Sequence, residues 1–374
     1  MNIDFKYPAL QINLDKIYEN AKNIVKLCSN NNIKVAGVVK GINAIPEVAD
    51  EFVKAGVDYM ADAKLSNIIK LKEHGINLPM MLIITPMMSE VHNVVKYVDI
   101  SVNSEIEVLK LLDKESQKQN KKHKVVLMYD VGDLREGIFK RDEFVNLALY
   151  VEKNLHNICL YGMGTNVGCY GAIKPTEKNI GELADIASEI EDKIGRKLDM
   201  ISGGATTCIS LLLDNKMPSE INNLRVGEAI LLSRDLPDIW GYNMNYMNED
   251  AIKLQAEVIE VQRKPTFPIG ERIVDSFGLT REYEDKGIRK RALLAVGRQE
   301  YAFEDKLIPL KEGAKIIGGS SNHLIVDVED CTDEVKVGDI LEFEMFYAPM
   351  PYLSQSKSVK KILVKDGSVL KECI

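Results

Sequence analysis

The alternation of short apolar runs with segments of helical periodicity constrains the fold of this chain more than any other feature. It extends over roughly the first 240 of the 374 residues and is typical of successive strands and helices. Such alternation predicts a parallel sheet, because parallel neighbours need a crossover connection, which is usually a helix. The eight predicted strands are Val35–Val39, Tyr59–Ala63, Met80–Ile84, Tyr97–Val102, Val125–Tyr129, Ile158–Met163, Leu198–Ser202 and Leu224–Leu232. Eight strands favour a closed (β/α)8 barrel, similar to a TIM barrel, over an open doubly wound sheet.

The pattern changes after about Tyr242, where apolar and polar residues alternate and turn residues separate the runs. The strands predicted there are Ile252–Val261, Arg272–Phe277, Arg291–Val296, Ala314–Gly318, Leu324–Val328, Ile340–Phe346 and Val359–Val364. We therefore expect an α/β protein with two domains, a barrel over residues 1–241 and a mostly-β domain over residues 242–374.

Composition excludes several classes of function. A net charge of −8 without a long Lys/Arg run argues against nucleic-acid binding. The six cysteines form no C-x-x-C pair and the five histidines no ligand spacing, so we expect no metal site. No G-x-G-x-x-G follows a predicted strand, which argues against a dinucleotide site. No signal peptide or membrane span is evident, so we expect a cytoplasmic protein that binds no membrane.

Lys40 follows directly on the first predicted strand, and Gly41 comes next. It could be a lysine that leaves the sheet for solvent, as most lysines do. It could instead be an amine in a partly dry pocket, where its pKa falls and it can bond covalently to a carbonyl group. The strand alone does not choose between these interpretations.

Further polar segments follow the later predicted strands, where a barrel of this kind carries its chemistry. They are Asp130–Gly137, Gly164–Gly171, Ser202–Thr207 and Arg225–Glu228. A Gly-Gly turn that leads into a helix exposes backbone N–H groups and suits a phosphate. Ser202–Thr207 could equally be a tight turn with a helix cap, and Arg225 could pair with a surface carboxylate.

Together these segments resemble the alanine racemase family of pyridoxal-phosphate enzymes, and within it the alanine/ornithine racemase subgroup. The resemblance lies in Val38-Val39-Lys40, in Asp130-Val131-Gly132-Asp133-Leu134-Arg135-Glu136-Gly137 and in Leu224-Arg225-Val226-Gly227, and it covers nearly the whole chain. It implies that Lys40 bonds to pyridoxal phosphate, that Arg135 contacts the cofactor and that Arg225 donates to its ring nitrogen. The other cofactor-binding residues that it implies are Asn166, Ser202, Gly203, Gly204, Ala205, Thr206, Gly227, Glu228 and Tyr352.

The resemblance also implies a second catalytic base from the β domain of a partner subunit, and thus a homodimer with shared active sites. The family's tyrosine position holds Arg298 here, with Tyr301 three residues further on. We expect Lys40 and Tyr301 to exchange protons on opposite faces of the substrate, with Tyr283 as an alternative base. Arg298 could supply a positive charge to the phenol or bind the substrate carboxylate.

The activity that the resemblance implies is racemisation of a small amino acid, with ornithine as the expected substrate. Alanine and other basic amino acids are alternative substrates, and a fold-related decarboxylase or aldolase and a non-catalytic cofactor carrier are alternative functions. A basic side chain needs an acid, for which Asp133, Glu136 and Glu300 are candidates. From composition alone, each of these three acids could equally be a solvated surface group.

Overall fold

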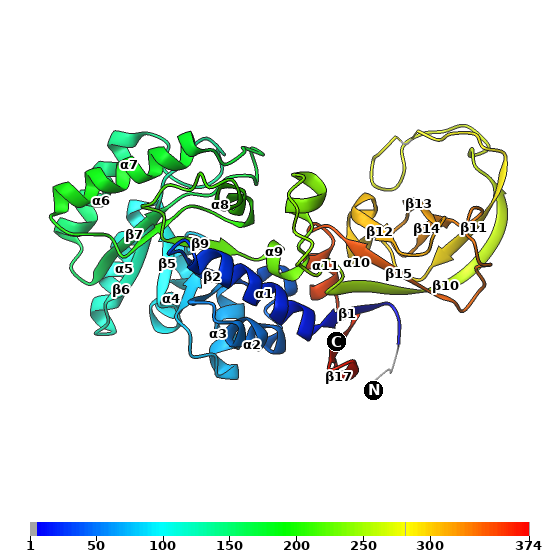
Figure 1. The fold of residues 1–374 in the computed structure, drawn as a ribbon, viewed down its shortest axis with the longest axis horizontal. Helices are drawn as coiled ribbons and strands as arrows, with labels where there is room; N and C mark the ends of the chain where they lie inside the picture. The colour runs from blue at the N-terminus through cyan, green and yellow to red at the C-terminus, as the bar shows by residue number, and fades with distance from the viewer. Residues whose placement is uncertain (1–5, 281, 374) are drawn as a thin grey trace. The chain divides into compact units, whose positions relative to one another are not determined.

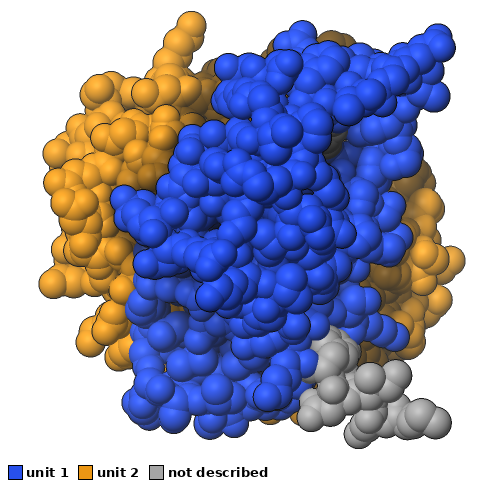
Figure 2. Space-filling model, turned by 90° about the vertical axis from the view of Figure 1, so that its right-hand side faces the viewer, with its two compact units in different colours: residues 1–16, 249–374 blue, residues 17–248 orange. Residues whose placement is uncertain are grey.

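The computed structural model describes residues 6–280 and 282–373 of the chain. It divides into two units, coloured separately in Figure 2. We call Ile17–Asn248 the barrel unit, and Met1–Lys16 with Glu249–Ile374 the β unit. Each unit is described by itself.

Eight parallel strands of the barrel unit close into a barrel in sequence order, which confirms the predicted fold class (Figure 1). The strands are β2 (Lys34–Val38), β3 (Tyr59–Asp62), β4 (Met80–Leu82), β5 (Ile100–Asn103), β6 (His123–Met128), β7 (Ile158–Gly164), β8 (Met200–Ser202) and β9 (Asn223–Val226). Closure comes from β9 pairing with β2, for example Val226 with Gly37. The carboxyl ends of β2 and β9, which precede Lys40 and follow Arg225, therefore lie side by side.

Helices precede, connect and follow the barrel strands. They are α1 (Leu14–Ser29), α2 (Pro46–Ala55), α3 (Leu65–His74), α4 (Val91–Tyr97), α5 (Ile106–Lys118), α6 (Arg141–Asn154), α7 (Glu177–Ile194), α8 (Ile209–Leu213) and α9 (Glu228–Leu231). Short helical turns add η1 (Lys40–Ile42), η2 (Met88–Glu90), η3 (Thr206–Cys208) and η4 (Asp235–Ile239). The helix α7 begins with a capping box in which Thr176 and Asn179 bond reciprocally, so Pro175-Thr176 marks its start. None of the helices in the described part of the chain combines the length and apolar character needed to cross a lipid bilayer.

Apolar side chains fill the interior of the barrel, as the near-continuous apolar runs of its strands require. Val38, Val102, Val126 and Met128 belong to this core, and each is at least nine-tenths buried. Apolar packing thus occupies much of the barrel interior, and the polar residues Asp62, Ser202 and Arg225 lie at the carboxyl ends of their strands.

The β unit is built on one nine-stranded sheet (Figure 1). Its strands are β1 (Ala9–Asn13), β10 (Ile252–Pro265), β11 (Ile288–Leu294), β12 (Leu307–Pro309), β13 (Lys315–Gly319), β14 (Leu324–Asp327), β15 (Ile340–Met345), β16 (Lys360–Lys365) and β17 (Ser368–Cys373). Two short helices, α10 (Arg298–Tyr301) and α11 (Met350–Gln355), and the turn η5 (Glu304–Lys306) complete it.

The structure differs from four sequence predictions. The segment Ala9–Asn13, within the predicted barrel domain 1–241, pairs with β10 and β16 in the sheet of the β unit. Residues 272–277 form no strand, because their polar and charged neighbours leave them mostly exposed. The predicted strand Leu224–Leu232 ends at Val226, after which Gly227 starts the short helix α9. The barrel unit ends at Asn248, a few residues beyond the predicted boundary.

Candidate active site

Lys40 lies at the carboxyl end of β2, in the helical turn η1. Asn43 and Ala44 adopt positive φ angles of 52° and 45°, which turn the chain sharply after the lysine. The Lys40 amine makes no hydrogen bond or ion pair with another described residue. Burial lowers its pKa, and the nearby Arg135 guanidinium adds to this effect, while Cys169, Asp62 and Glu136 oppose it. This environment fits the interpretation of an amine in a partly dry pocket.

Asp62, at the end of β3, is a fully buried acid that the sequence analysis did not single out. Its carboxylate accepts hydrogen bonds from the Asn67 side chain at 3.2 Å and from the Lys64 backbone at 2.8 Å. Burial raises its pKa, and its charge acts on Lys40. Its place at a strand end was the signal that could have identified it.

Arg135 lies on the loop after β6. Asp130 shapes this loop by accepting the N–H groups of Gly132 at 2.8 Å and Leu134 at 3.2 Å. The Arg135 guanidinium donates to the Glu136 carboxylate at 2.7 Å and to Cys169 Sγ at 3.2 Å. The loop therefore brings a cation and an acid close to the Lys40 amine, and Cys169, on the loop after β7, adds a thiol.

Arg225, at the end of β9, is 5% exposed. Its guanidinium donates to Ser202 Oγ and, at 2.6 Å, to the Thr165 carbonyl oxygen. No described residue receives its Nε–H. The alternative of a pair with a surface carboxylate is therefore wrong. Burial lowers the pKa of Arg225 to about 10, which still leaves it charged at neutral pH.

The turn Ser202–Thr206 is packed so closely that only glycine fits at two positions. A Cβ atom would lie 2.8 Å from Ile221 Cγ2 at Gly203 and 2.8 Å from Cys208 Sγ at Gly204, where φ is +131°. The backbone N–H groups of Gly204, Ala205 and Thr206 donate no hydrogen bond to another described residue. These donors are what a phosphate group requires.

Gly227 and Glu228 follow Arg225 at the start of α9. A Cβ atom on Gly227 would lie 2.8 Å from the Val38 carbonyl oxygen, so this glycine packs directly against the strand that leads to Lys40. The buried Glu228 carboxyl accepts the N–H groups of Arg234 at 2.8 Å and Asp235 at 3.0 Å through Oε1. Its Oε2 has no partner among the described residues. Burial and the neighbouring Asp235 raise the pKa of Glu228.

Two residues predicted for the site are enclosed within the β unit. Tyr301 is fully buried, and a Cβ atom on Gly319 would lie 2.1 Å from its hydroxyl oxygen. Arg298 is nearly buried, pairs with Glu304 and lies 3.6 Å from Asp275. These placements favour a core role for Tyr301 and a structural ion pair for Arg298. Tyr352, by contrast, is half-exposed and packs edge-to-face on Phe303.

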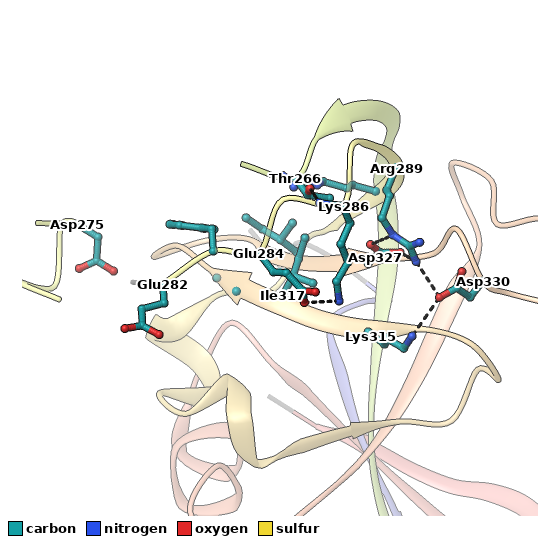
Figure 3. A pocket seen from close by; sticks show the side chains of 15 residues that line it. Thr266, Asp275, Glu282, Glu284, Lys286, Arg289, Lys315, Ile317, Asp327 and Asp330 are labelled. Carbon is teal, nitrogen blue, oxygen red and sulfur yellow. Dashed lines mark hydrogen bonds and ion pairs between the residues drawn. The ribbon is translucent and has the colours of Figure 1, made fainter. Parts of the chain in front are cut away.

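Tyr283 lines a cavity of about 370 Å³ in the β unit, shown in Figure 3. Six charged groups of this cavity pair with one another, as Arg289 does with Asp327 at 2.6 Å, Lys315 with Asp330 at 3.0 Å and Lys286 with Glu284 at 2.7 Å. Asp275, Glu282 and Arg291 also line the cavity and take no part in these pairs. Tyr283 itself is 40% exposed and lies under Arg272, whose guanidinium is 5.0 Å from its ring.

The three acids considered for the substrate side chain differ in their surroundings. Asp133 is 1% exposed and its oxygens accept the N–H groups of Cys169, Tyr170 and Gly171. Glu300 is 9% exposed and accepts the Gly297 N–H at 2.9 Å. The alternative of a solvated surface acid is therefore wrong for both. Glu136 keeps 28% of its side chain exposed beside Arg135.

Comparison with known proteins identifies the family of this chain. The sequence model of the alanine racemase N-terminal domain matches residues 12–235. The chain is 41% identical to an ornithine racemase of Acetoanaerobium sticklandii over 96% of this chain and 100% of that protein. The chain belongs to the alanine racemase family. It is also 37% identical to a lysine racemase of Thermotoga maritima, over 95% of this chain and 98% of that one.

The fold of this alanine racemase family member is shared with solved structures. An alanine racemase of Clostridium difficile 630 superimposes with a TM-score of 0.72 over 99% of both chains, at 20% identity. The match confirms the predicted combination of a barrel and a β domain.

Within this family member, the barrel unit brings together Lys40, Arg135, Arg225 and the Ser202–Thr206 turn at strand ends. Asn166, also predicted for the cofactor, is half-buried beyond β7 and its amide bonds to no described residue. Thr165 and Cys169, which contact the two arginines, were not predicted. Their position after a barrel strand was the available signal. Among the described residues, no group of three or more His, Cys, Asp or Glu side chains is placed to hold a metal ion.

Proposed function

We propose that this protein is a pyridoxal-phosphate-dependent racemase that interconverts L- and D-ornithine. The observation that carries the proposal is the juxtaposition of a partly buried amine, Lys40, with a buried cation, Arg225, at the carboxyl ends of neighbouring strands of the barrel. The ornithine racemase relative, which is similar over nearly the whole chain, supports the substrate.

The residues present fit pyridoxal phosphate. Lys40 would bond to its aldehyde carbon, and the N–H groups of Gly204, Ala205 and Thr206 would hold its phosphate. The Nε–H of Arg225 would meet its ring nitrogen, since the other two guanidinium nitrogens are held by Ser202 and Thr165. When bound, the cofactor makes the Cα proton of an amino acid acidic by delocalising the negative charge left on that carbon.

Lys40 is suited to move this proton on one face of the substrate. Its lowered pKa keeps a larger fraction of the amine neutral near pH 7 than an exposed lysine would have. A neutral amine accepts the proton at Nζ and returns it from the same atom.

Arg225 would control how strongly the cofactor ring can withdraw negative charge from the substrate carbon. A guanidinium only donates hydrogen bonds, so it leaves the ring nitrogen unprotonated. A cofactor held in this way would withdraw charge less strongly, which would favour rapid return of the proton to the carbon and hence racemisation. A decarboxylase of this fold would be expected to carry a carboxylate at the same place.

Racemisation needs a second base on the opposite face, and we assign it to the β unit of a partner subunit in a homodimer. Of the tyrosines named from the sequence, Tyr283 suits this role better than Tyr301, because its phenol is exposed and lies beside the Arg272 cation. The buried phenol of Tyr301 would have to leave its own core to reach any substrate.

For the substrate side chain we propose Glu136. It is the one member of the three candidate acids that retains exposure, whereas Asp133 and Glu300 accept backbone N–H groups. Its carboxylate, shared with Arg135, would attract the terminal ammonium of ornithine or lysine and give no advantage to alanine.

The test is a comparison of Lys40→Ala with Lys34→Ala, a matched control because Lys34 is an exposed lysine at the opposite end of β2. The wild type and the control should bind the cofactor with a visible absorbance band that borohydride abolishes. Lys40→Ala should lack the band and lose roughly a thousandfold or more in turnover. Chiral chromatography after incubation with L-ornithine, L-lysine or L-alanine then ranks the substrates. A colourless wild type in excess cofactor would contradict the proposal.

A further inference from the structure

The loop after β7 is held in place by the carboxylate of Asp133, a group with no role in the steps above. Asp133 Oδ1 accepts the N–H groups of Cys169 at 3.3 Å and Gly171 at 3.2 Å, and Oδ2 accepts that of Tyr170 at 3.1 Å. Hydrogen bonds to a carboxylate are stronger than those between neutral groups, and here the accepting side chain is buried. One buried side chain therefore fixes three consecutive backbone groups of the loop.

The backbones of the two loops are also in direct contact. A Cβ atom on Gly171 would lie 2.7 Å from the carbonyl oxygen of Asp133. Leu134 and Ala172, each next to one of these two residues, adopt φ angles of 57° and 51°. Such angles are unfavourable for residues other than glycine, and persist only where surrounding contacts hold them.

The other side of the same loop is fixed to the proposed phosphate turn. Thr207 donates to the Val167 carbonyl oxygen at 3.0 Å, and a Cβ atom on Gly168 would lie 2.7 Å from Thr207 Cγ2. The segment Val167–Gly171 thus connects the Arg135 loop on one side to the Ser202–Thr207 turn on the other.

The fixed loop in turn supports Arg135. Cys169 Sγ accepts a hydrogen bond from the Arg135 guanidinium at 3.2 Å, and its own N–H is held by Asp133. The charged and titratable groups that act on Lys40 are Arg135, Cys169, Asp62 and Glu136. Three of these four, Arg135, Glu136 and Cys169, lie on the loops that Asp133 joins.

We propose that Asp133 is a positioning residue, whose carboxylate locks the loop after β7 against the loop after β6 and so holds Arg135 beside Lys40. Asp133 would then position the loops of the site, and would not bind the side chain of the substrate. The effect on turnover rests on the proposed racemase function, whereas the effect on the loop does not.

The first test is hydrogen–deuterium exchange on the full-length enzyme with Asp133→Asn. Asparagine keeps one acceptor oxygen but presents an amide donor to the Tyr170 N–H, and it removes the charge. We expect the amides of 169–171 to exchange about tenfold faster or more, with the strands of the barrel unchanged. The matched control is Asp113→Asn, because Asp113 accepts the Asn157 N–H at 2.6 Å just before β7, at the opposite end of the same strand. Unchanged exchange at 169–171 in Asp133→Asn would overturn the proposal.

The second test is the pH profile of kcat, which reports the groups of the substrate-bound enzyme, for the substrate that the chiral assay identifies. If Arg135 drifts away in Asp133→Asn, the pKa of Lys40 rises, so the acidic limb of the profile should move to higher pH. Arg135→Gln should move it in the same direction, and Asp113→Asn should not. A loss of rate with an unmoved profile would mean that Asp133 supports only the fold.

Gly171→Ala is a second variant in case Asp133→Asn folds poorly. Its methyl group would press on the Asp133 carbonyl oxygen and should loosen the same amides. An enzyme that racemises no amino acid would contradict the proposed function and leave the exchange result interpretable. An active enzyme with rigid 169–171 amides in both variants would contradict the positioning role alone.

Discussion

At the scale of single residues, the active end of the barrel holds charged groups by burial and backbone hydrogen bonds. Arg225 bonds to a hydroxyl and a carbonyl oxygen, and Asp62 to an amide and a backbone N–H. Because these hydrogen-bond partners are neutral, they do not supply an opposite charge to either side chain. Such an arrangement stabilises the fold less than ion pairs would, and keeps the charges available to a ligand.

Glu228 should make the stability of the cofactor-free protein depend on pH. Burial and Asp235 raise its pKa from 4.5 to about 8. Between these values the folded state binds more protons than the unfolded state, so the free energy of unfolding falls as pH rises. Glu228→Gln keeps an acceptor for Arg234 and Asp235 and removes the titration. It should match the wild type near pH 5 and be more stable by about 1–3 kcal/mol at pH 8.

Urea unfolding of the wild type and Glu228→Gln across this pH range measures the difference. Glu220→Gln, at an exposed acid in the same unit, is the control and should follow the wild type. Curves for Glu228→Gln and the wild type that stay parallel at all pH values would show that this carboxyl group is already ionised in the folded protein.

At the scale of elements, β1 is notable because this strand, near the start of the chain, pairs with strands from the C-terminal part of the chain. It lies between β10, with which it is antiparallel, and β16, with which it is parallel. Leu10 and Ile12 on this strand are fully buried, while Gln11 between them is not. Residues 9–13 are therefore part of the core of the β unit.

Leu10→Ala should destabilise the β unit by about 2–5 kcal/mol, because it leaves a cavity in a closely packed sheet. Gln11→Ala, on the opposite face of the same strand, should cost less than about 1 kcal/mol. Hydrogen exchange of the β10 and β16 amides measures the effect directly and separates it from the barrel. Equal exchange in the two variants would mean that β1 contributes little to this sheet.

At the scale of the whole molecule, the proposed second base requires two chains. Large apolar side chains are exposed on the loops after β4, β6 and β7, at the active end of the barrel, and they include Met87, Leu134, Phe139 and Tyr170. Several exposed apolar side chains at one end of the barrel favour an interface there with a second chain.

A mixing experiment tests the shared site. Lys40→Ala and Tyr283→Phe should each be nearly inactive as homodimers. Subunit exchange between them places an intact Lys40 opposite an intact Tyr283 in one of the two sites of each mixed dimer. Random pairing should restore about a quarter of the wild-type activity. The mixture should stay inactive if both residues serve the site of their own chain, and an active Tyr283→Phe homodimer would exclude Tyr283 as the base.

The barrel, the family and the residues at its strand ends could be read from the sequence. Strand–helix alternation is local, and Lys40, Arg225 and the Gly203-Gly204 turn each follow a recognisable apolar run. The glycines are informative because neighbouring side chains approach both of them closely and Gly204 has a φ of +131°, which disfavours other residues there. These features depend on residues that are close together in the sequence, so the sequence alone can predict them.

The tertiary structure alone decided what depends on contacts between distant segments. Local pattern could not show that Ala9–Asn13 joins a sheet formed some 240 residues later, or that Asp133 binds the backbone of 169–171. Nor could it show that Tyr301 is enclosed in the β unit, since burial is a property of packing. The same residue type can be a base, a clamp or a core group, and only its surroundings in space distinguish these roles.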